Sequence, residues 1–126
     1  MKVIYVAGKY RDKHPYLIWD HINEARYIAT EVWQMGAVAL CPHMNSMFLD
    51  GVASEDALVE GTLELMRRCD AVIVCWNYAT SVGTLGEIAE AMKLGKPVFY
   101  STAELYKWIQ EQISTCSNVP DVQKSG

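Results

Sequence analysis

The residues best suited to chemistry lie between a short apolar run and the helical pattern that follows it. Residues 71–75 (AVIVC) are apolar and rich in β-branched side chains, which favours a strand buried on both faces of a parallel sheet. A Gly/Ser/Thr loop, residues 81–86, follows, and Glu87 then begins a helical pattern that Gly95 ends. Backbone N–H groups at a helix N-terminus attract anions. The segment therefore predicts an anion site with a carboxylate, Glu87, in the first turn of the helix.

Basic and aromatic residues follow the first apolar run of the chain. Lys9 and Arg11 lie there, and Arg11 can hold a phosphate through two parallel hydrogen bonds. The glycine spacing matches neither a Walker A loop nor a GxGxxG motif, which disfavours phosphoryl transfer. A carboxylate beside a sugar instead suits glycosidic chemistry, in which Glu87 stabilises or captures an oxocarbenium-like carbon. Four aromatic residues are candidates for stacking on a base: Tyr5, Tyr10, Trp76 and Tyr78.

Short apolar runs alternate with amphipathic segments along the chain. The predicted strands are residues 3–7, 37–41, 71–75 and 97–100. The predicted helices are residues 16–35, 54–68 and 87–94, and a last helix begins at the capping box of residues 101–104. Residues 43–53 are expected to form a loop. This order predicts an α/β fold, namely a doubly wound, flavodoxin- or Rossmann-like sheet of four to five parallel strands in the order 2-1-3-4.

The predicted topology brings three distant segments to one place. In a doubly wound sheet, ligands bind at the carboxyl ends of the strands, where the winding reverses. With the order 2-1-3-4, that point lies between the first and third strands. Residues 8–11 and 76–87 are therefore expected to face each other across one cleft, with the loop around His43 beside them.

Length and composition indicate one ordinary globular domain. The chain has 126 residues, 51% hydrophobic and 21% charged, and its formal charge of −4 disfavours a nucleic-acid partner. No apolar run approaches the ~20 residues of a membrane span, and no signal segment precedes the first strand, so we expect a cytoplasmic protein without a membrane partner. The four cysteines lack metal-binding spacing, and we expect neither metal nor cofactor. The domain is predicted at residues 1–115, with a flexible tail at 116–126.

Several motifs give the chain a more specific resemblance. They are IYVAGKYR near the start, CPH, LELMRRCDAVIV, SVGTLGEIAEA and GKPV, and they span residues 4–98. In these motifs the chain resembles the nucleoside 2-deoxyribosyltransferase-like superfamily. It looks most similar to a branch of short bacterial and phage proteins, near the N-glycosidases of 2′-deoxynucleoside 5′-monophosphates. The segment from Ser81 to Glu87 carries the most specific part of the resemblance.

The resemblance implies roles for individual residues. Glu87 stands at the position of the nucleophile that attacks the anomeric carbon, and Tyr5 stands near the position of an active-site tyrosine. Ser81 and Arg11 stand where the nucleotide hydrolases hold the 5′-phosphate. The other substrate-binding candidates are Gly8, Lys9, Tyr10, His43, Trp76, Gly83 and Thr84. The resemblance also implies a small-molecule nucleoside or nucleotide substrate and a homodimer or homotetramer.

One position departs from the superfamily pattern. An aspartate that protonates the leaving group or orients the ribose usually stands eight residues before Asp70, where this chain has Thr62. Three alternatives are open. Another carboxyl group can take the place of this aspartate, namely Glu60, Asp56 or Asp50. Otherwise, either the leaving group needs no acid or the activity is weak or lost.

Two functions therefore follow from the sequence. The first is an N-glycosidase or deoxyribosyltransferase that cleaves the base–sugar bond of a (deoxy)nucleoside 5′-monophosphate. The alternative is a non-catalytic protein that binds a nucleotide or an ADP-ribose-like ligand. Without the resemblance, Glu87 is equally explained as a carboxylate that the helix dipole favours by about 0.3–1 kcal/mol. Asp70 is expected to bond backbone N–H groups rather than to act in catalysis.

Overall fold

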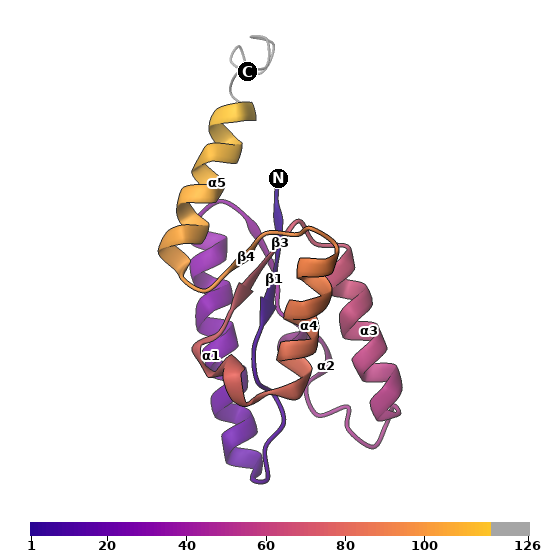
Figure 1. Ribbon diagram of the computed structural model, residues 1–126. Helices are drawn as coiled ribbons and strands as arrows, with labels where there is room; N and C mark the ends of the chain where they lie inside the picture. Colours follow the sequence, from indigo (N-terminus) through magenta and orange to yellow (C-terminus); the bar gives the residue numbers. More distant parts are fainter. Residues whose placement is uncertain (117–126) are drawn as a thin grey trace.

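The computed structural model describes residues 1–116 and forms one parallel sheet between two layers of helices (Figure 1). The sheet has four strands in the order β2-β1-β3-β4, and every neighbouring pair is parallel. The strands are β1 (Val3–Ala7), β2 (Val38–Leu40), β3 (Ala71–Val74) and β4 (Val98–Phe99). The predicted α/β fold, doubly wound sheet and strand order are thus confirmed. Of the predicted tail, residues 117–126 lie outside the described part of the chain.

The helices begin and end largely where local signals in the sequence require. They are α1 (Pro15–Gln34), α2 (Pro42–Ser46), α3 (Glu55–Arg67), α4 (Val82–Lys93) and α5 (Thr102–Cys116), with a short 3₁₀ helix, η1 (Trp76–Thr80). Ser54 and Ser101 cap α3 and α5 by accepting hydrogen bonds from the Ala57 and Glu104 N–H groups. The prediction of a loop over residues 43–53 was wrong at its start, because Pro42 opens the short helix α2.

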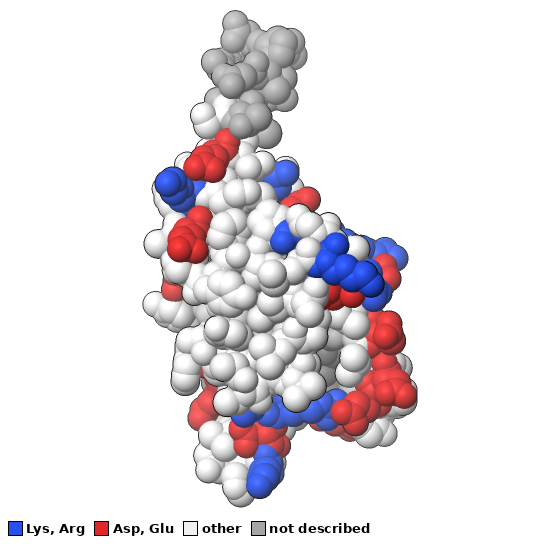
Figure 2. Space-filling model, viewed as in Figure 1, with Lys and Arg blue, Asp and Glu red and all other residues white. Residues whose placement is uncertain are grey.

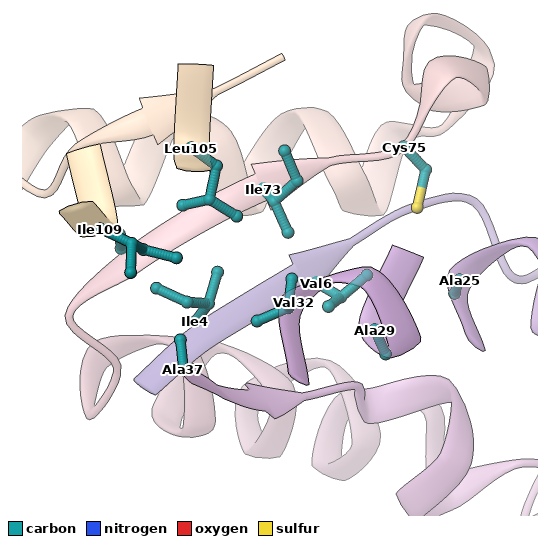
Figure 3. Close-up of a cluster of buried hydrophobic side chains, with 11 residues drawn as sticks. Ile4, Val6, Ala25, Ala29, Val32, Ala37, Ile73, Cys75, Leu105 and Ile109 are labelled. Carbon is teal, nitrogen blue, oxygen red and sulfur yellow. The ribbon is translucent and has the colours of Figure 1, made fainter. Parts of the chain in front are cut away.

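The two faces of the sheet have separate hydrophobic cores, because side chains alternate along β1. Ile4 and Val6 face α1 and α5, where the cluster in Figure 3 includes Ala29 of α1 and Leu105 of α5. Tyr5 and Ala7 face the opposite way. They pack in a second cluster with side chains of α3, β3, α4 and the α3–β3 connection: Met66, Cys69, Val72, Val74, Ile88 and Ala91. The register of β1 therefore directs Tyr5 toward α4, the helix that carries Glu87.

The start of α4 differs from the prediction in a way that matters for Glu87. Residues 81–86 were predicted as a loop, but Ser81 caps a helix that begins at Val82. The Ser81 hydroxyl accepts hydrogen bonds from the N–H of Thr84 at 3.1 Å and from its hydroxyl at 2.8 Å. A serine cap outweighs the weak helix propensity of the glycines that follow it. Glu87 thus lies in the second turn of α4, where the helix dipole acts on it less directly.

Asp70 has the structural role that was predicted for it. Its side chain accepts a hydrogen bond of 2.8 Å from the Val3 N–H and so joins the start of β1 to the residue before β3. Among residues 1–116, no helix has both the length and the apolar character required to cross a membrane. Cys41, Cys69 and Cys75 are free thiols.

Candidate active site

A cavity of about 580 Å³ lies at the carboxyl ends of β1 and β3. Its walls come from the connection after β1, from α2, from one face of α3 and from the first half of α4. The sequence-predicted residues that line it are Tyr5, Gly8, Lys9, Tyr10, Arg11, His43, Ser81, Gly83, Thr84 and Glu87. The three segments expected to form one site are therefore brought together.

Tyr5 and Glu87 form the centre of this cavity. Tyr5 is 0% exposed, and its hydroxyl donates a hydrogen bond to the Glu87 carboxylate. The side chain of Thr62 lies within hydrogen-bonding reach of the same hydroxyl. Burial, followed by the charge of Glu87, raises the pKa of Tyr5 well above that of a free tyrosine. Tyr5 therefore stays protonated and fixes one oxygen of Glu87, while the carboxylate still lines the cavity.

The Glu87 carboxyl group titrates near neutral pH. Burial raises its pKa to about 7, although the hydrogen bond from Tyr5 lowers the pKa in part. A carboxyl group with this pKa exists in both protonation states around neutrality, which suits a group that must be ionised to react. Glu87 lies in the second turn of α4, beyond the first turn where the helix dipole acts most strongly.

The first turn of α4 offers hydrogen-bond donors to the cavity. The N–H of Thr84 is occupied by Ser81, and the N–H of Leu85 bonds to the Ser81 carbonyl oxygen. Helix geometry leaves the N–H groups of Val82 and Gly83 without an intrahelical acceptor, and both residues line the cavity. This end of the cavity can therefore accept an anionic group.

The two basic residues of the cavity already contact acidic side chains. Arg11 lies 3.9 Å from Asp50 and 3.7 Å from Glu55, both of which also line the cavity. Lys9 lies 3.9 Å from Asp12, and its ammonium group donates to the Thr80 hydroxyl at 3.3 Å. An incoming anion must compete with these partners for the two cations.

His43 is a buried wall residue whose ring has one free acceptor. Its Nε2 donates to the Lys9 carbonyl oxygen at 2.9 Å, and its ring packs edge-on against Tyr10. Burial lowers the pKa of His43, so the ring is neutral and its Nδ1 carries no proton. Nδ1 is buried and has no hydrogen-bond partner among residues 1–116. A ligand N–H is the kind of group that would satisfy it.

Two aromatic candidates lie outside the cavity lining. Trp76 is the first residue of η1 and is 79% exposed, and Tyr78 packs against Tyr100. The 3₁₀ turn directs this part of the segment away from the cavity. Conversely, the cavity contains residues that motif-based reasoning did not select: Thr80 of η1, Glu90 of α4, and Leu58, Val59 and Leu63 of α3. Thr62, which the resemblance placed at the position of the usual aspartate, also lines the cavity.

No group of three or more His, Cys, Asp or Glu side chains that could hold a metal ion occurs within the described residues.

Gly8 allows the two strands beside the cavity to end close together. A Cβ atom on Gly8 would lie 2.6 Å from the Cys75 sulfur and 2.8 Å from its Cβ. We expect Gly8→Ala to lower the free energy of unfolding by about 1–3 kcal/mol, because the strand ends must separate. Urea denaturation measures this effect. Gly61→Ala is the matched control, since no atom lies within 4 Å of the added Cβ. Equal stabilities of Gly8→Ala and the wild type would contradict the proposed close approach.

Comparisons with known proteins agree with this fold. No curated protein gives a significant match to the chain. A solved structure of a 2-deoxyribosyltransferase from the psychrotolerant bacterium Bacillus psychrosaccharolyticus superposes with a TM-score of 0.56 and 20% sequence identity. The match covers 76% of this chain and 69% of the other chain. A family model described as a domain of unknown function, DUF7768, matches residues 2–101. The chain therefore belongs to the DUF7768 family.

Proposed function

We propose that this chain cleaves the base–sugar bond of a (deoxy)nucleoside 5′-monophosphate, as an N-glycosidase or a deoxyribosyltransferase. The observation that carries the proposal is the Glu87 carboxylate, held by Tyr5 and lining a cavity beside the N-terminus of α4. The fold shared with a 2-deoxyribosyltransferase, which is described as a biocatalyst for nucleoside synthesis, supports a nucleoside-type substrate. Motif resemblance supports the narrower assignment near the nucleotide N-glycosidases.

In the proposed reaction, Glu87 acts as the nucleophile. The ionised carboxylate attacks C1′ of the sugar, the base departs with the electrons of the C1′–N bond, and a glycosyl-enzyme ester forms. Water or a second base then attacks C1′ and releases the carboxylate. Tyr5 holds one carboxylate oxygen, so the other oxygen is directed at the sugar. The Glu87 carboxyl group of the unliganded protein has a pKa of about 7. Because only its ionised form attacks C1′, turnover should rise as pH increases through neutrality.

The 5′-phosphate is proposed to bind at the first turn of α4. Val82 and Gly83, whose N–H groups have no intrahelical acceptor, line the cavity there after the capping residue Ser81. Arg11 is proposed as a further phosphate ligand, which requires it to exchange Asp50 and Glu55 for the phosphate. Both pairs are longer than 3.5 Å and involve partly exposed side chains, so they are weak enough to exchange.

Gly83→Ala tests the phosphate site. No atom lies within 4 Å of an added Cβ at Gly83, so alanine should leave α4 intact and stabilise it by about 0.5–1 kcal/mol. The methyl group would nevertheless stand in the cavity beside the phosphate-binding N–H groups. We expect nucleotide affinity to fall about tenfold while nucleoside affinity changes little, measured by calorimetric titration. Gly61→Ala should gain similar stability without any loss of affinity. A loss of affinity that is equal for nucleotide and nucleoside would argue against a phosphate at this position.

A second candidate function is non-catalytic binding of a nucleotide or an ADP-ribose-like ligand. The observation that favours it is Thr62, whose hydroxyl lies at Tyr5 and donates to the Val59 carbonyl oxygen at 3.0 Å. A threonine cannot protonate a leaving base as a carboxylic acid would. If the chain only binds its ligand, Glu87→Gln should retain ligand binding, and neither the wild type nor this variant should release a base.

A nucleotide panel distinguishes the two functions. Thermal-shift measurements detect binding, because a ligand at 100 times its dissociation constant stabilises the folded state by about 2.7 kcal/mol. Chromatography of the same mixtures detects free base. Binding with base release supports the enzyme, and binding without release supports the second candidate. Neither binding nor release from any nucleoside or nucleotide would contradict both.

We also propose that the chain forms a homodimer or homotetramer. The face over β4 and the neighbouring part of α4 is largely free of charged side chains, whereas charged side chains lie over α5 and at the margins of this face (Figure 2). Large apolar side chains are exposed on these elements and at the end of β4: Val82, Leu85, Met92, Tyr100 and Tyr106. An uncharged apolar face of this kind suits a protein–protein contact. Sedimentation equilibrium that gives only the 14.2 kDa monomer would contradict the proposal.

A further inference from the structure

The described cavity has no side chain placed to protonate a departing base. This inference rests on the proposed function, in which Glu87 attacks C1′ and the C1′–N bond breaks. The bonding electrons then pass to a ring nitrogen of the base. An ordinary purine or pyrimidine leaves as an anion unless an acid donates a proton, and such an acid typically contributes about 10²–10⁴-fold to the rate. The carboxyl, phenol, imidazole and ammonium groups that line the cavity are the candidates for such an acid, and the Lys9 ammonium among them already donates to the Thr80 hydroxyl at 3.3 Å.

Three further carboxyl groups line the cavity, and each lies near an arginine side chain. Asp50 and Glu55 lie near the guanidinium group of Arg11, at 3.9 and 3.7 Å. Glu90 lies 3.4 Å from the Nε of Arg67. An ionised carboxylate accepts hydrogen bonds and has no proton to donate. Glu87 is the nucleophile and must itself be ionised.

The neutral donors of the cavity are also engaged. The hydroxyl of Tyr5 donates to Glu87, and the Nε2–H of His43 donates to the Lys9 carbonyl oxygen. The Tyr10 oxygen accepts the N–H of Phe48, and its own donor is a phenol rather than a carboxylic acid. The hydroxyl of Thr62 donates to Val59. Each group has a structural partner, and none of them is a carboxylic acid or a charged imidazole.

The charge of the cavity also bears on the kind of base that can leave. Its lining contains two basic residues, Lys9 and Arg11, and four acidic residues: Asp50, Glu55, Glu87 and Glu90. With all of these ionised, the lining has a formal charge of −2. Among nucleotides that share the same 5′-phosphate, such a site favours one with a cationic base over one whose base leaves as an anion. His43, 5% exposed, has a buried Nδ1 without a hydrogen-bond partner among the described residues.

We propose that the substrate carries a cationic base, joined to C1′ through or beside a quaternised ring nitrogen, as in a pyridinium or an N7-alkylated purine nucleotide. When Glu87 attacks C1′ of such a compound, the electrons of the C1′–N bond neutralise the ring. The base departs as a neutral molecule, and no proton is needed at this step. Water then attacks C1′ of the ester, the carboxylate leaves, and one proton passes to solvent. Atoms and charge balance without any co-reactant other than water.

The experiment compares matched substrates with the wild-type protein. 7-Methyl-2′-deoxyguanosine 5′-monophosphate and 2′-deoxyguanosine 5′-monophosphate share the sugar and the phosphate, and nicotinamide mononucleotide provides the pyridinium arm. Base release from each compound is measured by chromatography and divided by the uncatalysed rate of the same compound. We expect the rate enhancement for at least one cationic base to exceed that for the unmodified nucleotide by about 10²-fold. Which cationic compound reacts identifies the kind of base.

Thr62→Asp tests the missing acid directly, with Thr62→Asn as the control of similar size without an acidic proton. We expect Thr62→Asp to raise release from the unmodified nucleotide at least about tenfold, with little change for the cationic compounds and no gain in Thr62→Asn. If Thr62→Asp does not fold, the wild-type comparison decides alone. Equal rate enhancements for cationic and unmodified bases would overturn this inference and leave the proposed function intact. No release from any of the three compounds would overturn both.

Discussion

Replacing Glu87 by glutamine is expected to lower base release at least about 10³-fold. Glutamine is nearly the same size as glutamate, and its carbonyl oxygen can still accept the hydrogen bond from Tyr5. The fold and the cavity should therefore be preserved. An amide oxygen, however, is a far poorer nucleophile than a carboxylate, and loss of a covalent nucleophile removes most of the chemical rate enhancement. Initial rates of base release, measured by chromatography at saturating nucleotide, give the ratio.

Glu90→Gln provides the matched control for this experiment. Glu90 lies one turn further along α4, lines the same cavity and pairs with Arg67. Its replacement removes the same charge from the cavity but leaves the Glu87–Tyr5 pair in place. We expect a change in rate of no more than about tenfold, as is typical of the loss of one charged contact. Equal losses in the two variants would mean that cavity charge, rather than a nucleophile at Glu87, supports the reaction.

The fold was predictable because its main determinants are local or periodic. The β-branched run before Cys75, the proline at the start of α1 and the serines that cap α3 and α5 each act over a few residues. The strand order depends on general rules for parallel sheets. The same rules brought residues 8–11 and 81–87 to one cavity. The helix α2 was missed because a five-residue helix has too few positions to show a periodic pattern.

The details of the site were less predictable, because they depend on contacts between distant residues. Trp76 is exposed because it lies at the start of the 3₁₀ helix η1, and no residue spacing in the sequence predicts that helix. The pairing of Arg11 with Asp50 and Glu55 requires the conformation of the α2–α3 connection. The alternation of side chains along β1 could be predicted from the sequence. The hydrogen bond from Tyr5 to Glu87 could not, because it joins residues that lie 82 positions apart. Motif resemblance identified both residues of that pair without showing that they touch.

The buried position of Glu87 also has a thermodynamic consequence that can be measured without any substrate. Burial raises the pKa of this carboxyl group from 4.5 to about 7, so the folded chain binds the proton more tightly than the unfolded chain. The resulting stabilisation is complete below about pH 4.5 and is lost as pH rises through 7. Its upper bound is about 3 kcal/mol of unfolding free energy. The wild-type protein should therefore become less stable between pH 5 and pH 8.

Glu87→Gln should remove this part of the pH dependence, since glutamine does not titrate. We expect the variant to match the wild type near pH 5 and to exceed its free energy of unfolding by up to about 3 kcal/mol at pH 8. Urea denaturation of both proteins at these two pH values measures the difference. Glu90→Gln, which retains Glu87, should keep the wild-type pH dependence. Tyr5→Phe should shift the loss of stability to higher pH, because the hydrogen bond from Tyr5 lowers the pKa of Glu87. The same pH dependence in Glu87→Gln and the wild type would contradict a neutral-range pKa at Glu87. The reaction proposed for the cavity would then lose its link to a carboxylate that is ionised only near and above neutrality.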